Sequence, residues 1–240
     1  MKSLPLLPCL PLVISLLALL SLALSGFGVR QGWWPLRMGF LMLEWSAYAG
    51  LAAAVCAFAF MASPLRRGAL PALLVGLVVG LVTAFLPWQW KQQAQALPKI
   101  HDISTDLTHP PVFEKILPLR AIAPNPAAYG GEAIAAEQRK GYPDIQPREV
   151  AFPPAETFAR ALAAASGMGW QIVDADAGKG IIEATDTTLW FGFKDDIVIR
   201  IVPAGTGSRI DMRSVSRVGK SDVGTNAARI RKYFATLAKP

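Results

Sequence analysis

Three long stretches of the first 98 residues are almost free of charge, and they restrict the chain to folds that place them in a membrane. They cover residues 3–29, 38–65 and 68–90, and Glu44 is the single charged residue inside them. About 20 apolar residues suffice for a helix to cross a bilayer. A cleaved signal peptide is the alternative, but its apolar core usually has roughly 7–15 residues, and in this chain two further apolar stretches follow the first. We predict a membrane region, 1–97, with three transmembrane helices at about 4–28, 38–63 and 69–90.

The distribution of basic residues gives a small orientation preference. Lys2 and the Arg66-Arg67 pair lie on the same side of the predicted spans, and short loops rich in Lys and Arg favour the cytoplasm. The preference is small because three basic residues fall on the other side: Arg30, Arg37 and Lys91. With this orientation we predict a bacterial inner-membrane protein whose chain after the third span lies in the periplasm.

The net charge of +7 does not indicate a nucleic-acid partner, because residues 1–98 contribute +5 of it at the membrane flanks. The rest of the chain is asymmetric: residues 99–199 carry −5 and residues 200–240 carry +7. We expect these two parts to neutralise each other in the fold. The alternative is an anion-binding face on the last strand and helix. Cys9 and Cys56 both lie in apolar stretches, so no disulfide framework or zinc site is expected.

Residues 98–147, which we call the strap, contain eight prolines and therefore favour extended segments and turns over long helices. One short helix is expected at 132–140. Apolar residues through the first part of the strap indicate that it wraps along a domain surface, the alternative being a structureless linker.

Residues 148–240 predict an α+β core. Alternation or β-branched content indicates strands at 148–152, 170–174, 181–189, 196–202 and 209–216. Helical periodicity follows Pro153-Pro154 and ends at Gly167 or Gly169, and a last helix follows a cap at Ser221 or Asp222. The order β-α-β-β-β-β-α predicts a curved antiparallel sheet with helices on one face, a helix-grip-like arrangement.

Three segments carry a family resemblance: HDISTDLTHPPVF (101–113), IEATDTTLWFGFKDDIVIRI (182–201) and IDMRSVSRVGKSDVGTNAARI (210–230). They closely resemble the DUF1499 family, a domain of unknown function, over about the last 140 residues. The resemblance implies no activity, substrate or cofactor. It implies only that certain positions characterise the family: His101, Asp102, Ser104, Thr105, Asp106, Trp190, Phe193, Asp195, Asp196, Arg213, Ser214, Ser216, Arg217, Asp222, Asn226 and Arg229.

Eleven of these polar and aromatic residues are candidates for ligand binding: His101, Asp102, Asp106, Trp190, Asp195, Asp196, Arg213, Ser216, Arg217, Asn226 and Arg229. Arginines beside the N-terminus of the last helix could grip an anion. The alternative is that Arg213 and Arg217 pair with Asp195, Asp196 or Asp211. The segment from His101 to Asp106 could hold a metal or supply a general base, or its side chains could form turn bonds that fix the strap.

Two further features have a functional and a structural interpretation. Trp190 and its aromatic neighbours line a pocket for a lipid-like ligand, or they belong to the core. Glu44 is a proton or ion site in the membrane, or it reaches the interface from within two turns. The segment Gly219-Lys220-Ser221 stands between a strand and a helix, but Ser214 occupies the position where a phosphate-binding loop requires glycine.

The first hypothesis is a non-enzymatic, membrane-anchored envelope domain that binds a partner protein or a lipid-like or anionic ligand. The second is an enzyme acting on an anionic or lipidic envelope substrate through His101 and Asp106 with Arg213 and Arg217. The sequence contains no Ser-His-Asp order, no cluster of metal ligands and no glycine-rich phosphate loop. The expected partners are therefore the lipid bilayer and an envelope protein or lipid-like ligand, with no cofactor, metal or nucleic acid.

Overall fold

The computed structural model describes residues 6–66 and 68–237. The first residues of the predicted first span, together with Lys2 and Arg67, lie outside this part. The chain divides into two compact units. The helical unit comprises residues 1–93 with 189–192, and the sheet unit comprises 94–188 with 193–240.

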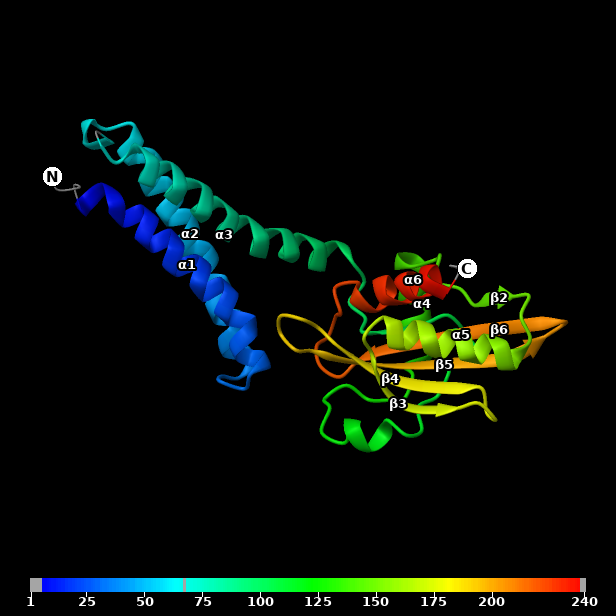
Figure 1. Ribbon diagram of the computed structural model, residues 1–240. Helices are drawn as coiled ribbons and strands as arrows, with labels where there is room; N and C mark the ends of the chain where they lie inside the picture. The colour runs from blue at the N-terminus through cyan, green and yellow to red at the C-terminus, as the bar shows by residue number, and fades with distance from the viewer. Residues whose placement is uncertain (1–5, 67, 238–240) are drawn as a thin grey trace. The chain divides into compact units, whose positions relative to one another are not determined.

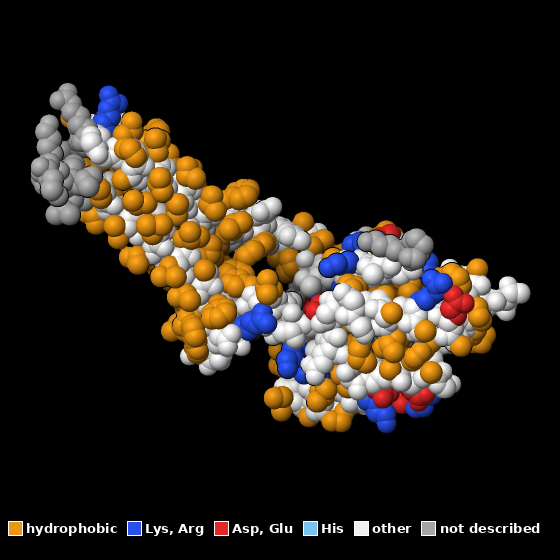
Figure 2. Space-filling view, viewed as in Figure 1, with side chains coloured by type: hydrophobic (Ala, Val, Ile, Leu, Met, Phe, Trp, Pro, Cys, Tyr) orange, Lys and Arg blue, Asp and Glu red, His pale blue; other side chains and the backbone are white. Residues whose placement is uncertain are grey.

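The helical unit contains α1 (Leu6–Arg30), α2 (Leu36–Met61) and α3 (Leu70–Ala96), with a short 3-10 turn, η1 (Pro64–Arg66), before α3. In the described part of the chain these three helices are long and apolar enough to cross a membrane. Hydrophobic side chains cover most of their visible surface (Figure 2). The predicted helices are confirmed, and they indicate a membrane protein.

Small residues bring the three helices together. A Cβ on Gly80 would lie 2.5 Å from the carbonyl oxygen of Gly50, so the backbones of α2 and α3 are in direct contact. A Cβ on Gly76 would lie 2.9 Å from the backbone of Leu12, and the Ser15 hydroxyl donates to the Gly76 carbonyl at 2.7 Å. Lipid tails are as apolar as these side chains, so close backbone packing and such hydrogen bonds hold the helices together.

Exposed aromatic residues of α2 and α3 lie at one level of the helices. Because Gly50 touches Gly80 and α2 and α3 run antiparallel, exposed Trp45 lies within about a turn of the height of exposed Trp88. Tryptophan is enriched where lipid headgroups meet hydrocarbon. About 17–19 residues of each helix separate this level from the opposite ends, a length that matches the hydrocarbon thickness.

The sheet unit is built on a six-stranded antiparallel sheet within the described residues. Its strands are β1 (Asp102–Ser104), β2 (Arg148–Val150), β3 (Gln171–Asp176), β4 (Ile181–Thr187), β5 (Lys194–Ala204) and β6 (Gly207–Ser216). The order is β1-β6-β5-β4-β3, and β2 also pairs with β6, so that β1 and β2 share one edge of that strand. The predicted α+β fold is confirmed.

Helices α5 (Pro154–Gly167) and α6 (Thr225–Leu237) cover one face of the sheet (Figure 1). The inward residues of β4, β5 and β6 form the main core with Trp170 and Tyr233, whose rings stack at 5.4 Å. A third helix, α4 (Gly131–Gly141), closes the edge of β1. The Gln138 amide there accepts from the Ser104 N–H at 3.0 Å and donates to the Ser104 carbonyl at 2.6 Å, as a neighbouring strand would.

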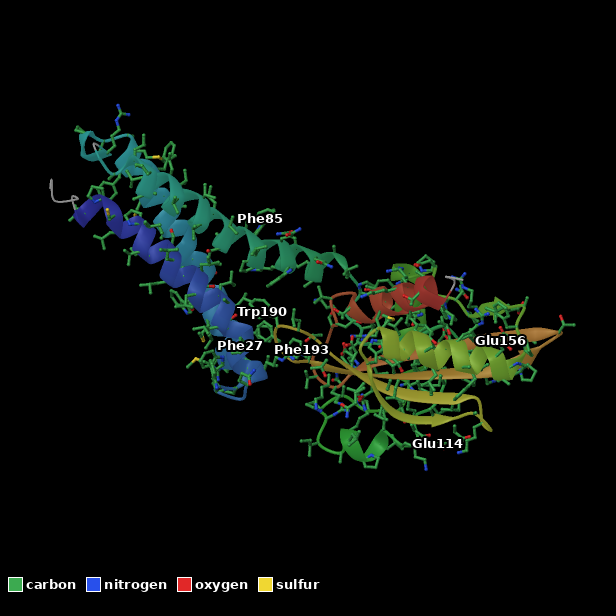
Figure 3. All side chains as sticks on the ribbon, viewed as in Figure 1. Phe27, Phe85, Glu114, Glu156, Trp190 and Phe193 are labelled. Carbon is green, nitrogen blue, oxygen red and sulfur yellow. The ribbon has the colours of Figure 1, made fainter. Side chains whose placement is uncertain are left out.

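The strap covers the other face of the sheet. Its 3-10 turn η2 (Leu117–Arg120) follows Phe113 and Ile116, which pack on Val198 and Val215 in a second hydrophobic cluster. In Figure 3, Glu156 marks α5 and Glu114 marks the strap. The strap buries the face of β6 that carries Arg213, which is only 2% exposed.

Close contact between α2 and α3 gives a testable prediction. The substitution Gly80→Leu should lower the midpoint of heat denaturation of the detergent-solubilised protein, because the new side chain would force the two backbones apart. Ala52→Leu on the exposed side of α2 is the matched control and should leave the midpoint within about 2 °C. Equal effects of the two substitutions would contradict the packing described.

Candidate functional site

Alternation along the central strands sends neighbouring polar residues to opposite faces of the sheet. Asp195 points to the face covered by α6, and Asp196 points to the face covered by the strap, as their hydrogen-bond partners show. The residues predicted to bind a ligand are therefore divided between two networks. We call them the strap-face network and the helix-face network.

Arg213 and Asp102 form a deeply buried ion pair of the strap-face network. The Arg213 Nε and Nη2 atoms donate to the two Asp102 oxygens at 2.9 and 2.7 Å, and the side chains are 2% and 4% exposed. The guanidinium also lies 5.2 Å from the ring of Phe113 and 5.3 Å from that of Tyr129. This fork-like, stacked geometry suits arginine and fixes the strap to β6.

Asp196 binds two arginines at once. Its carboxylate accepts from Arg120 at 2.6 Å, from Arg217 at 2.8 Å through each of two nitrogens, and from the Thr185 hydroxyl at 2.7 Å. Burial by itself would raise the pKa of Asp196, but these hydrogen bonds outweigh burial and hold the pKa below its usual range. Asp196 therefore stays ionised and links the strap to β6 through β5.

A third group lies at the other end of the same face. Arg200 and Arg209 both pair with Asp211 at 2.9 Å, and both also reach Asp106 at 3.0 Å. Asp106 additionally accepts the backbone N–H groups of Thr108 and His109. This carboxylate thus forms both a turn within the strap and an ion pair with the sheet.

Glu183 binds the strap without any arginine. Its carboxylate is fully buried on β4 and accepts the backbone N–H groups of residues 114, 115 and 116 at 2.6, 3.2 and 2.7 Å. Three consecutive donors form a cradle of the kind that binds anions, and here the anion is the protein's own side chain.

The charges that take part in the strap-face network balance within the described residues. The network holds five arginines (Arg120, Arg200, Arg209, Arg213 and Arg217) and five carboxylates (Asp102, Asp106, Glu183, Asp196 and Asp211). The network has no surplus positive charge to offer to an anionic ligand, and its partners are already within the fold.

Arg229 is the centre of the helix-face network. From α6 it donates to Asp195 at 2.6 Å, to Asp186 at 2.8 Å and to the Ser214 hydroxyl at 3.1 Å. Asn226, one turn earlier, accepts from the Ser214 hydroxyl at 2.7 Å and donates to the Ser216 hydroxyl at 3.0 Å. These bonds seat α6 on the sheet.

Asp222, one of the two residues predicted to cap the last helix, caps the start of α6. Its carboxylate accepts the backbone N–H groups of Gly224 and Asn226, each at 2.9 Å. Burial raises the pKa of Asp222 and outweighs these hydrogen bonds. The helix N-terminus that could have attracted an anion is thus already occupied by a carboxyl group of the protein.

His101 and Asp106 are not brought together. The His101 carbonyl accepts from the Ser216 N–H and the Asn226 amide, each at 3.0 Å, whereas Asp106 pairs with arginines beyond the far end of β1. About five residues of extended chain separate them, or roughly 16 Å. Among the described residues no group of His, Cys, Asp and Glu could hold a metal ion.

Trp190 belongs to neither hydrophobic cluster of the sheet unit. It lies on the loop between β4 and β5, whose residues 189–192 group with the helical unit. Within that unit its indole N–H donates to the Ala23 carbonyl at 2.8 Å, and its ring lies 4.9 Å from that of Trp90. The surroundings of residues 189–192 therefore come from the helical unit and not from the core of the sheet.

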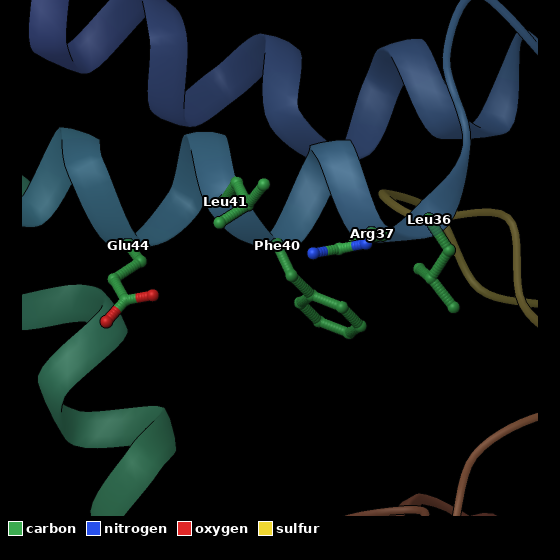
Figure 4. A pocket seen from close by; sticks show the side chains of 5 residues that line it. All are labelled: Leu36, Arg37, Phe40, Leu41 and Glu44. Carbon is green, nitrogen blue, oxygen red and sulfur yellow. The ribbon is translucent and has the colours of Figure 1, made fainter.

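Glu44 lines a shallow cavity of about 410 Å³ on one side of α2, together with Leu36, Arg37, Phe40 and Leu41 (Figure 4). Its carboxylate accepts a hydrogen bond from Tyr48 at 3.2 Å. Glu44 immediately precedes Trp45, an exposed residue of the type enriched where lipid headgroups meet hydrocarbon. This position supports the interpretation that the carboxylate reaches the lipid headgroups, where hydration remains available.

The chain belongs to the family described as "Protein of unknown function (DUF1499)", whose model matches residues 102–237. The matched region begins at β1 and ends with α6, so it coincides with the strap, the sheet and both polar networks. No curated protein matches the chain. The resemblance inferred from the sequence is confirmed.

Four members of the strap-face network were not predicted from the sequence: Arg120, Tyr129, Glu183 and Thr185. Arg120 stands in a proline-rich segment without periodicity, and nothing in its neighbourhood indicates burial. Glu183 carried a usable signal, since a carboxylate between Ile182 and Ala184 interrupts an otherwise apolar strand. Such a residue requires a partner when both faces of the sheet are covered.

The Arg213–Asp102 pair gives a prediction of stability. Arg213→Ala should lower the free energy of unfolding by about 3–5 kcal/mol, because Asp102 would remain buried without its partner. The midpoint of heat denaturation in detergent should fall by about 10 °C or more. Arg231→Ala breaks the exposed pair with Asp144 and should cost less than about 1 kcal/mol. If the two variants lost comparable free energy of unfolding, the buried pair would not be a main support of the strap.

The lowered pKa of Asp196 gives a prediction of pH dependence. The unfolded chain has the higher pKa, about 3.8, so Asp196 stabilises the fold above that pH. The contribution is lost as the pH falls through the lower folded-state pKa. Thermal midpoints measured from pH 6 to pH 2 should therefore fall in this acidic range. Asp196→Asn should be unstable already at pH 6 and should show a flatter profile; an unchanged slope would argue against this assignment.

Proposed function

We propose that this DUF1499 protein is a non-catalytic, membrane-anchored domain of the bacterial cell envelope. It binds a partner protein or a lipid-like ligand through its surface. The observation that supports this proposal is that the family's characteristic polar residues are already paired. The arginines and carboxylates that a catalytic or anion-binding site would use are bound to one another.

The proposed location is the inner membrane with the sheet unit in the periplasm. The support is the short loop that carries Arg66, which favours the cytoplasmic side together with the N-terminus. An odd number of crossings, by the helices described, then leads the chain out of the cytoplasm after α3.

The alternative function is an enzyme that uses His101 and Asp106 with Arg213 and Arg217 on an envelope substrate. The geometry gives this alternative less support. Asp106 is held by two arginines, Arg213 and Arg217 have separate carboxylate partners, and a general base must lie within hydrogen-bond reach of its target.

The test compares full-length protein, released from native membranes in mild detergent, with its His101→Ala variant. Native mass spectrometry should show a retained lipid or protein on both, because the proposed binding does not use the imidazole. In parallel, each protein is incubated with a total lipid extract of the envelope, and the lipids are analysed by mass spectrometry. No product masses should accumulate.

Product masses that form with the wild type and disappear with His101→Ala would overturn the proposal in favour of the enzyme. The circular dichroism spectrum of the variant serves as the control for folding. A wild-type protein that retains neither lipid nor protein would also count against the proposal.

A further inference from the structure

The turn η2 and the residues after it expose large apolar side chains and bury a charged one. Leu117, Leu119 and Ile122 are 46%, 50% and 96% exposed, whereas Arg120 between them is only 5% exposed. Covering the sheet would require the opposite pattern, with aliphatic side chains inward and the arginine in water. These three large apolar side chains therefore form an exposed apolar tip on the strap, which we call the strap tip.

The strap tip is held rigidly from beneath. Arg120 donates to Asp196 at 2.6 Å and to the carbonyls of Val215 and Asn125 at 3.3 and 3.1 Å. Arg217 also donates to the Leu119 carbonyl at 2.9 Å. The inward position is filled by a bonded guanidinium, so the aliphatic side chains cannot turn inward without breaking an ion pair. Their exposure is built into the fold.

Three exposed lysines lie on segments that are connected to the strap tip. Lys115 precedes it by two residues and is exposed. The backbone of Arg217, whose side chain contacts the tip, is bonded to the carbonyl of exposed Lys194 at 3.0 Å. The Asn125 amide, which follows the tip, donates to the Gly219 carbonyl at 2.9 Å, beside exposed Lys220. The lysines have no carboxylate partner among the described residues, in contrast to Lys179, which pairs with Glu114 at 2.7 Å.

Apolar side chains at the tip with unpaired lysines around them match the two components of an anionic lipid surface. Aliphatic groups enter the boundary between headgroups and acyl chains, and the lysines are attracted to the lipid phosphates. The sheet unit is covalently joined to the helices that indicate a membrane protein, so a bilayer is present at high effective concentration. Figure 2 shows separate hydrophobic side chains, together with acidic and basic ones, along the lower edge of the sheet unit, where Figure 1 draws part of the strap in green.

We propose that the strap tip is a second membrane contact that inserts Leu117, Leu119 and Ile122 into an anionic lipid surface. This inference rests on the proposed function and specifies the ligand as anionic lipid and the site as the strap tip. It assigns the aliphatic residues to insertion and the lysines to charge attraction. Arg120 and Asp196 position the turn.

The test uses the full-length protein with Cys9→Ala and Cys56→Ala, carrying one added cysteine labelled with the fluorophore NBD. Ile122→Cys places the label at the tip, where high exposure makes the change harmless to packing. Glu149→Cys on exposed β2 is the matched control. Both are reconstituted in nanodiscs of phosphatidylglycerol or of phosphatidylcholine, with and without lipids that carry a nitroxide quencher on the acyl chain.

In phosphatidylglycerol the quencher should reduce the emission of the Ile122→Cys label about threefold and leave the Glu149→Cys label nearly unchanged. Phosphatidylcholine should abolish most of this difference, and so should replacement of Lys115, Lys194 and Lys220 by Gln, because the electrostatic attraction is lost. The circular dichroism spectrum and thermal midpoint should remain those of the parent protein.

Two results would overturn the inference. The Ile122→Cys label could be as accessible to aqueous iodide as the Glu149→Cys label in phosphatidylglycerol, which would place the tip in water. It could instead be shielded from iodide without being quenched by the labelled lipids, which would indicate a protein contact. If either result occurs while native mass spectrometry still finds a bound lipid or protein, the proposed function stands and the assignment of its site fails.

Discussion

Ion pairing between the strap and the sheet is the interaction on which the rest of the sheet unit depends. Apolar packing on the strap face is limited to a small cluster around Phe113 and Ile116, whereas the main core lies under the helices. The arginine–carboxylate layer therefore has to hold a long stretch of proline-rich chain in place. Such a layer is sensitive to loss of a single member, because the remaining charge stays buried. This sensitivity offers a physical reason why a family signature can consist of charged residues without describing a reaction.

The charge asymmetry of the sequence has the same explanation. Carboxylates of the segment before residue 200, such as Asp102 and Asp196, pair with arginines after it, such as Arg213 and Arg217. The expectation of mutual neutralisation could be reached from the sequence because it needs only net charges. Which carboxylate each arginine pairs with could not be predicted in this way. Arg213 was expected to pair with one of three nearby aspartates and instead pairs with Asp102, 111 residues earlier.

The elements were easier to predict than the site. Uncharged stretches reveal membrane helices, and alternation such as that of Ile197, Ile199 and Ile201 reveals strands, because both signals are local. The same alternation places Asp195 and Asp196 on opposite faces of β5. Burial of Arg120 and Glu183 depends on how the strap lies across the sheet, which no local period encodes. The surroundings of the aromatic loop at Trp190 could not be predicted for the same reason, since they come from the helical unit.

The long reach of these ion pairs has a consequence for synthesis. The strap is translated directly after α3, yet the partner of Asp102 is made 111 residues later. At about 5–20 residues per second the ribosome needs roughly 5–20 s to deliver it. Contacts of such high sequence separation also slow folding itself, because the chain loses the entropy of closing a long loop before the contact can form and stabilise it. During this interval the strap carboxylates remain hydrated and the future core strands remain uncovered beside the membrane. The domain thus becomes complete only when its C-terminal helix has been made.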